Sequence, residues 1–228
     1  VALAGGGSVP RPGEISLAHH GVLFLDELPE WSRNALEVLR EPLESGRVTI
    51  SRAARQCEFP ERFQLIAAMN PCPCGWAGDP SGRCRCGIEA IRRYRARISG
   101  PLLDRIDLQV EVPRLASAEL RTGNLPGESS ECVRERVVAA RERQLARAGT
   151  PNARLDQAQT REACRLEPAD EALLERAMDG LQLSARALHR ILRVARTIAD
   201  LDGSDAIRTP HLSEALGYRR FERALAAA

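Results

Sequence analysis

Two acidic side chains, Asp26 and Glu27, directly follow the apolar run VLFL at residues 22–25. An apolar run without alternation is typical of a buried strand in a parallel sheet, and ligands bind at the carboxyl edge of such sheets. One carboxylate at that edge can hold Mg²⁺ on a nucleotide, while the next orients or deprotonates an attacking water. The pair therefore predicts nucleotide hydrolysis; the alternative is a strand that ends in solvent with two acids.

A second apolar run, FQLIAAM at residues 63–69, is followed by Asn70. If both runs are parallel strands of one sheet, Asn70 lies at the same edge as the acidic pair. Its neutral amide can then hold the attacking water by hydrogen bonds. An isolated Asn is usually a turn former. The prediction for Asn70 therefore depends on its place beside Asp26 and Glu27.

A dense group of thiols lies in CPCGWAGDPSGRCRC, which holds four of the seven cysteines. Four thiolates satisfy tetrahedral Zn²⁺, and the Gly, Pro and Asp residues between the pairs allow the chain to turn back. Each pair has C-x-C spacing instead of the usual C-x₂₋₄-C, so a reduced metal-free loop and two disulfides remain alternatives. The predicted structural zinc ligands are Cys72, Cys74, Cys84 and Cys86.

Composition narrows the class of protein. The 228 residues are 43% hydrophobic and 28% charged, as in a globular protein, with a net charge of +2 that is too small to argue for nucleic-acid binding by itself. No apolar run approaches the roughly 20 residues of a membrane span, and no signal peptide is evident, so we expect a cytoplasmic protein. All 33 basic residues are arginine. A P-loop of the form GxxxxGK[ST] therefore cannot occur within these residues.

The secondary-structure pattern that must position these side chains divides the sequence into two parts. Up to about Pro113, β-like runs alternate with helical patterns, as in α/β proteins. Ser32 can cap a helix through about Ser45, residues 47–60 form a hairpin pattern, and the alternating segment IDLQVEV at 106–112 predicts a further strand. We expect the two strands that carry the polar residues to be covered on both faces.

The remainder is rich in Ala, Arg, Leu and Glu and gives no strand signal. Ser184 and Thr209 are predicted caps, and Pro168 and Pro210 suit first-turn positions. Helices are predicted at 131–149, 168–179, 184–201 and 209–225. The expected domains are an α/β part at 1–113, a linker at 114–130 and a helical part at 131–228.

Longer phrases surround these positions. They are GGGSVPRPGEISLAHHGVLFLDELPE, LREPLESGRVTISRAA, AAMNPCPCG, RYRARISGPLLDRIDLQVEVP and LSARALHRILRVARTIADL. The phrases cover most of residues 5–112 and 181–202, whereas 113–180 adds only helical character. They resemble one family, the magnesium-chelatase-like AAA+ ATPases of the ComM/YifB type, which are similar to DNA branch-migration helicases.

The resemblance implies an AAA+ core, a P-loop NTPase-like parallel sheet, followed by a small all-α lid domain. The family also has an N-terminal Lon-protease-like domain and a Walker A strand and helix, which these residues lack. Because the chain also begins at Val1 inside a Gly-rich stretch, we expect a C-terminal half that hydrolyses no ATP by itself.

The resemblance also assigns roles to single residues. Asp26 and Glu27 correspond to Walker B and Asn70 to sensor 1. Arg105, in GPLLDRIDL, corresponds to the arginine finger that acts on a neighbouring subunit, and Arg186 to sensor 2, acting in cis or in trans. The implied cofactors are ATP and Mg²⁺, with Asp26, Asn70 and Arg186 as nucleotide contacts. The implied assembly is a homo-oligomer, a hexameric ring.

Three further stretches gain meanings from the family. Residues 5–21 look like the helix-2 insertion, and we expect His19 and His20 in its return arm to pack or hydrogen-bond rather than bind metal. The hairpin is similar to a pre-sensor 1 hairpin that contacts DNA, although a solvated tip is the alternative. Its candidate DNA ligands are Arg47, Arg52 and Arg55. The arginine-rich helix at 88–98 can bind DNA or a neighbouring subunit, with a solvated face as the default.

Together these patterns predict an ATP-driven AAA+ ring motor that acts on branched or single-stranded DNA, as in natural transformation or recombination. Two alternatives remain. One is a magnesium-chelatase-type motor that drives metal insertion into a porphyrin. The other is a zinc-stabilised, non-catalytic module that binds DNA or protein.

Overall fold

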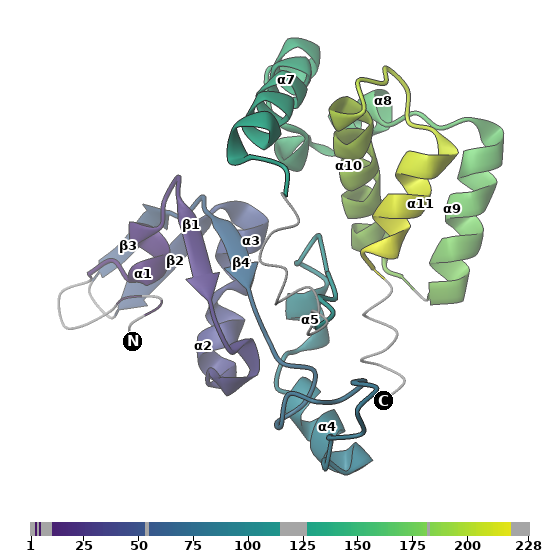
Figure 1. The fold of residues 1–228 in the computed structure, drawn as a ribbon. Coiled ribbons are helices and arrows are strands. Elements are labelled where there is room, and N and C mark those ends of the chain that lie inside the picture. The colour runs from purple at the N-terminus through teal and green to yellow at the C-terminus, as the bar shows by residue number, and fades with distance from the viewer. Residues whose placement is uncertain are drawn as a thin grey trace. The chain divides into compact units, whose positions relative to one another are not determined.

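The computed structural model describes residues 3, 5, 11–52, 55–114, 127–181 and 183–219. They form two compact units, one containing the described residues up to Ile106 and the other those from Asp107 onward. Figure 1 labels the strands and α-helices of both units. Most of the predicted linker at 114–130 lies outside the described residues.

The first unit is mixed α/β. Strands β1 and β4 pair in parallel, with Val22 opposite Gln64 and Leu25 opposite Ala67, and β2 and β3 form the predicted antiparallel hairpin. The sequence patterns for these strands are confirmed. The elements are α1 (Glu14–Leu17), β1 (Val22–Leu25), η1 (Leu28–Glu30), α2 (Arg33–Val38), α3 (Arg40–Ser45), β2 (Arg47–Arg52), β3 (Arg55–Pro60), β4 (Gln64–Ala67), α4 (Ile88–Arg95) and α5 (Gly100–Leu103).

The core of this unit lies on one face of the parallel pair. Leu23 and Leu25 of β1 are buried among apolar side chains of α1, α2 and α5, with Leu36 as the contribution of α2. Val22 and Phe24 lie on the other face of β1 and are 55% and 59% exposed. Alternate side chains of a strand point to opposite faces, so the expectation that both faces are covered is wrong for this structure.

The predicted helix at 32–45 is present but interrupted. Ser32 caps it as expected, because its Oγ accepts a hydrogen bond from the N–H of Ala35 at 3.3 Å. The helix breaks between α2 and α3 at Leu39. Pro42 explains the break, since it has no N–H to donate to the carbonyl of Val38.

The alternating segment at 106–112 is not a strand, which corrects the sequence prediction. The N–H of Gln109 donates to the carbonyl of Tyr218 at 3.2 Å instead of to a neighbouring strand. Val110 and Val112 are 66% and 85% exposed. Alternation marks a strand only where a partner strand satisfies its backbone, and here the partner is the end of a helix.

The second unit is helical, as predicted, and no helix among its described residues or those of the first unit is both long and apolar enough to span a membrane. Its core surrounds α10, with Ile191, Ala195 and Ala199 buried against Leu212 and Ala215. The sequence missed α8, although its capping box at Asp156 and Gln159 was readable. The elements are α7 (Ser130–Ala148), η2 (Asn152–Arg154), α8 (Gln157–Ala163), α9 (Pro168–Leu181), α10 (Ala185–Leu201) and α11 (Thr209–Gly217).

Of the two predicted caps in this unit, one is confirmed and one is wrong. Ser184 caps α10 as predicted, with its Oγ accepting from the N–H of Ala187 at 3.1 Å. Thr209 is the first residue of α11 instead of its N-cap, which is Arg208. The Thr209 hydroxyl donates to Oδ1 of Asp170 and so ties α11 to α9. α11 ends at Gly217 with Tyr218 as its C-cap, so the helix predicted to run to 225 is shorter than expected.

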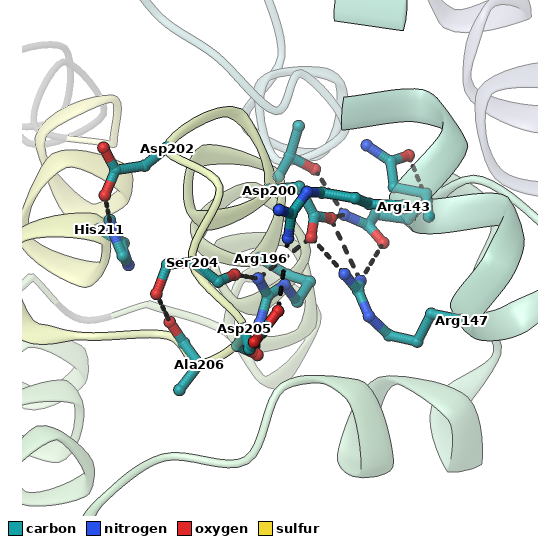
Figure 2. A network of polar contacts seen from close by, with 12 residues as sticks. Arg143, Arg147, Arg196, Asp200, Asp202, Ser204, Asp205, Ala206 and His211 are labelled. Carbon is teal, nitrogen blue, oxygen red and sulfur yellow. Dashed lines mark hydrogen bonds and ion pairs between the residues drawn. The ribbon is translucent and has the colours of Figure 1, made fainter. Parts of the chain in front are cut away.

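A buried ion cluster around Asp200 holds this unit together (Figure 2). Asp200 and Arg196 are 2% and 1% exposed, and their side chains pair at 3.1 Å across one turn of α10. Arg147 of α7 forms a second ion pair with the same carboxylate, and Asn152 Nδ2 donates to its Oδ2 at 2.8 Å. Arg196 also donates to the carbonyl of Asp205 at 2.8 Å. The carboxylate thus links α7, η2 and α10.

Replacing Asp200 with Asn should destabilise the chain by about 3 kcal/mol or more, because it leaves the buried Arg196 without its anion. Asp202→Asn is the matched control. The side chain of Asp202 is 71% exposed and lies 3.2 Å from the ring of the buried His211. Because water can solvate that carboxylate, its loss should cost at most about 1 kcal/mol. Urea unfolding followed by circular dichroism measures both. Equal midpoints for the two variants would refute the structural role of the cluster.

Candidate functional site

The acidic pair and Asn70 lie at one edge of the parallel sheet. Beyond the paired residues, Ala68 N–H donates to the carbonyl of Leu25 and Leu28 N–H donates to the carbonyl of Ala68, both at 2.9 Å. These bonds keep the two chains side by side as they leave the sheet. Asp26, Glu27 and Asn70 are exposed there. The structure thus places the three predicted residues at the carboxyl ends of neighbouring parallel strands, where α/β proteins bind ligands.

Glu27 has an unusual backbone. Its φ of 50° and ψ of 47° lie in the left-handed region, which costs a side-chain-bearing residue about 1 kcal/mol or more. Its N–H donates to Oδ1 of Asp26 at 2.8 Å, and the indole N–H of Trp31 donates to the carbonyl of Asp26 at 3.0 Å. These bonds hold the turn that presents two adjacent carboxylates to solvent. Strain of this kind is concentrated at functional sites.

The backbone at Asn70 contacts α4, and the cysteine loop follows it directly. Burial raises the pKa of Tyr94 on α4, and a hydrogen bond with the backbone of Asn70 opposes that shift. Arg95 Nε donates to the carbonyl of Pro71 at 3.1 Å. Gly75 adopts φ of 78°, and a Cβ there would lie 3.8 Å from Oδ1 of Asn70. Residues of α4 thus hold the backbone at Asn70 and Pro71, and the following loop passes close to the Asn70 amide at Gly75.

Arg105 is buried, with only 7% of its side chain exposed, and it forms an ion pair with Glu44 of α3. Its Nη1 also donates to the carbonyl of Pro101 at 2.6 Å. A role on a neighbouring subunit would require this guanidinium to leave Glu44. Sequence reasoning missed Glu44, because nothing in LREPLES distinguishes it from other acids of that helix.

The remaining predicted arginines belong to other elements than the strands that carry the acidic pair and Asn70. Arg186 is exposed in the first turn of α10 and belongs to the second unit. Arg47 pairs with Glu58 across the hairpin at 2.8 Å, and both side chains are more than half exposed. Arg52 and Arg55 face each other in the hairpin register, but their side chains lie outside the described part of the structure. His19 accepts a hydrogen bond on Nδ1 from the N–H of Arg62 at 3.0 Å, in line with its predicted bonding role.

The loop after Asn70 brings all four clustered cysteines together. Their ligand atoms lie within 4.8 Å of one another. The Sγ atoms of Cys72 and Cys74 are 3.4 Å apart, those of Cys74 and Cys84 3.7 Å, and those of Cys72 and Cys84 3.9 Å. Zinc bonded to four sulfurs at about 2.3 Å would hold them roughly 3.8 Å apart. The separations therefore fit one tetrahedral ion, and they do not correspond to disulfide bonds.

The backbone around these thiols favours thiolates. Hydrogen bonds from the backbone of Trp76 and then Arg85 lower the pKa of Cys74 to about 6. The N–H of Ala77 donates to Sγ of Cys72 at 3.2 Å. A hydrogen bond with Cys74 raises the pKa of Cys86 to about 11, as expected where several thiols crowd together and one has already ionised. The donor set and its geometry thus suit a structural Zn²⁺ ion.

Comparison with known proteins identifies the family of this chain. Residues 1–120 match the family described as magnesium chelatase, subunit ChlI, and residues 127–219 match the family of its C-terminal part. The chain belongs to the magnesium chelatase ChlI family. Within this family it is of the ComM/YifB type, as the relatives show.

Competence protein ComM of Haemophilus influenzae is 53% identical over 98% of the chain, and the uncharacterized protein YifB of Escherichia coli is 52% identical over the same share. The match covers 44% of the length of each of these relatives. The magnesium-chelatase 38 kDa subunit of Acidiphilium rubrum is more distant, with 26% identity over 99% of the chain and 64% of that subunit. The chain thus spans less than half the length of ComM and YifB.

Proposed function

We propose that the complete protein is an AAA+ ATPase that acts on DNA as a ring-shaped motor in the cytoplasm. The observation that carries the proposal is the strained turn at Glu27. It presents two carboxylates at the end of β1, while Asn70 follows the neighbouring parallel strand. An edge of this kind suits a nucleotide with its Mg²⁺ ion and an attacking water.

In this proposal Asp26 holds Mg²⁺, Glu27 takes the proton of the attacking water and Asn70 orients that water. ATP would bind between this edge and the Walker A element expected elsewhere in the complete protein. Arg105 would stabilise the transition-state charge on the nucleotide of an adjacent subunit of a hexamer, and Arg186 of the lid would contact the nucleotide. The membership in the magnesium chelatase ChlI family supports an ATPase-type chemistry.

DNA is the proposed substrate because the greater similarity is to a competence protein and the lesser to magnesium-chelatase subunits. The hairpin arginines, Arg47, Arg52 and Arg55, are the proposed contacts, through phosphate oxygens. Arg47 would exchange Glu58 for a phosphate in such a complex.

ATP hydrolysis by the complete protein, measured with branched DNA, with single-stranded DNA and without DNA, tests this function. We expect DNA to stimulate hydrolysis. Stimulation by a porphyrin and its partner subunits, and not by DNA, would support the chelatase-type alternative. An absence of ATP binding under all conditions would leave the non-catalytic module as the better description.

We also propose that Cys72, Cys74, Cys84 and Cys86 hold a structural Zn²⁺ ion. The sulfur separations and the backbone hydrogen bonds to the thiols support it. The ion would fix the loop that directly follows Asn70, and we expect it to contribute to folding and to the position of that amide.

Protein purified without chelator should carry about one Zn²⁺ per chain, because a closed thiolate site binds zinc tightly. Serine at any of the four positions should release the metal and slow ATP hydrolysis through Asn70. Cys132→Ser is the control, since that cysteine is exposed on α7. Elemental analysis with thiol titration measures both quantities. A zinc content near zero with all four thiols reactive would refute the site.

A further inference from the structure

An open pocket lies in the first unit between the start of α2 and the end of α4. Three arginines, one glutamate and one tryptophan line it, together with small residues. Its lining residues are Glu30, Trp31, Ser32, Arg33, Arg93, Ala96 and Arg97. The pocket adjoins the acidic pair through Trp31, but none of its side chains has a part in the proposed hydrolysis.

Trp31 is presented to this pocket in a fixed orientation. The indole N–H donates to the carbonyl of Asp26 at 3.0 Å, and the residue remains 37% exposed. A flat aromatic side chain that is anchored by its polar atom is suited to stack against another flat group.

The charges around the indole favour an anion. Arg97 is partly neutralised, since its Nη1 donates to Glu30 Oε2 at 2.8 Å and to the carbonyl of Pro29 at 3.0 Å. Arg33 and Arg93 reach the same pocket from two different helices and are exposed. With Glu30 occupied by Arg97, Arg33 and Arg93 leave the pocket with two positive charges. Guanidinium groups bind phosphate oxygens in a bidentate manner.

We propose that this pocket binds one nucleotide unit of a single-stranded DNA, with the phosphate on Arg33 and Arg93 and the base against Trp31. The combination of a cationic groove with an aromatic platform is the chemistry that binds single strands without sequence preference. This inference rests on the proposed action on DNA and adds a contact distinct from the hairpin. Through the Trp31–Asp26 hydrogen bond, an occupied pocket would also support the turn at Glu27.

The test measures binding of a fluorescein-labelled oligothymidylate to the complete protein without nucleotide, at several salt concentrations. The double variant Arg33→Gln/Arg93→Gln should lose roughly 10-fold in affinity. Its slope of log affinity against log salt should be shallower by about 1.4, which is the counterion release of two phosphate contacts on a single strand. Arg134→Gln/Arg141→Gln, two exposed arginines of α7, is the control that removes the same charge elsewhere.

A second readout reports on Trp31 itself. The tryptophan fluorescence of Trp31 is obtained as the difference between the wild type and Trp31→Phe. Binding of unlabelled oligothymidylate should quench it. The same quenching by thymidine monophosphate at matched nucleotide concentration would make a free nucleotide the occupant and would overturn the strand proposal. An unchanged Trp31 emission, or equal affinity losses in the two double variants, would also overturn it. Failure of the wild type to bind any DNA would instead refute the proposed function.

Discussion

Glu27→Gln in the complete protein should retain ATP binding but lower the rate of hydrolysis by about 10²-fold or more, the scale expected for the loss of a positioned base. Glutamine has the same shape as glutamate and can keep the left-handed turn and the N–H bond to Asp26. The substitution therefore removes the basic carboxylate without removing the structure that presents it. Nucleotide affinity and steady-state phosphate release are the two measurements.

Glu89→Gln is the matched control for this variant. Glu89 is an exposed acid of α4 in the same unit, paired with Arg92 at 3.2 Å on the helix surface. It should hydrolyse ATP at the wild-type rate. Wild-type hydrolysis by Glu27→Gln would show that the exposed acids at the end of β1 do not form the catalytic site.

Arg105→Ala should abolish turnover while leaving nucleotide affinity nearly unchanged, because a guanidinium supplied by a neighbouring subunit acts on transition-state charge. The partner that it leaves behind, Glu44, has 47% of its side chain exposed. Water can therefore solvate that carboxylate. We expect turnover to be lost while the unfolding temperature changes little. Thermal unfolding beside phosphate release separates the two effects.

Mixing Arg105→Ala subunits with Glu27→Gln subunits distinguishes action in trans from action in cis. Some interfaces of a mixed ring pair an intact Glu27 with an intact Arg105, so part of the activity should return. Each variant alone should stay inactive. A mixture that forms verified mixed rings and regains no activity would count against the trans role of Arg105.

Local patterns predicted the main elements correctly. The apolar runs at 22–25 and 63–69 form the parallel pair β1 and β4, and the hairpin and four of the helices occur where the sequence placed them. These features depend on side-chain periodicity, turn residues and caps within a few positions. The same local reasoning failed at 106–112, where apolar and polar residues alternate but the described residues include no neighbouring strand. It also failed at Pro42, which interrupts a helix with regular apolar spacing.

The sequence by itself determined the types of residue available for chemistry and the order in which they follow strands and helices. It predicted that Asp26, Glu27 and Asn70 share an edge, because parallel strands end on the same side. The close spacing of four cysteines in the sequence also predicted that their thiols cluster. The shared edge follows from strand direction, and the cysteine cluster follows from a short separation along the chain.

Only the tertiary structure decided which distant side chains meet. It placed Arg105 on Glu44, joined Arg147 to Asp200 and brought Arg93 to Trp31. It also drew the sulfurs of Cys72, Cys74 and Cys84 to separations that suit zinc. Such pairs depend on how helices pack and loops close, and they leave no periodic signal because their members lie on different elements. Burial then sets their strength, since an ion pair removed from water is weakened far less by screening than one at the surface.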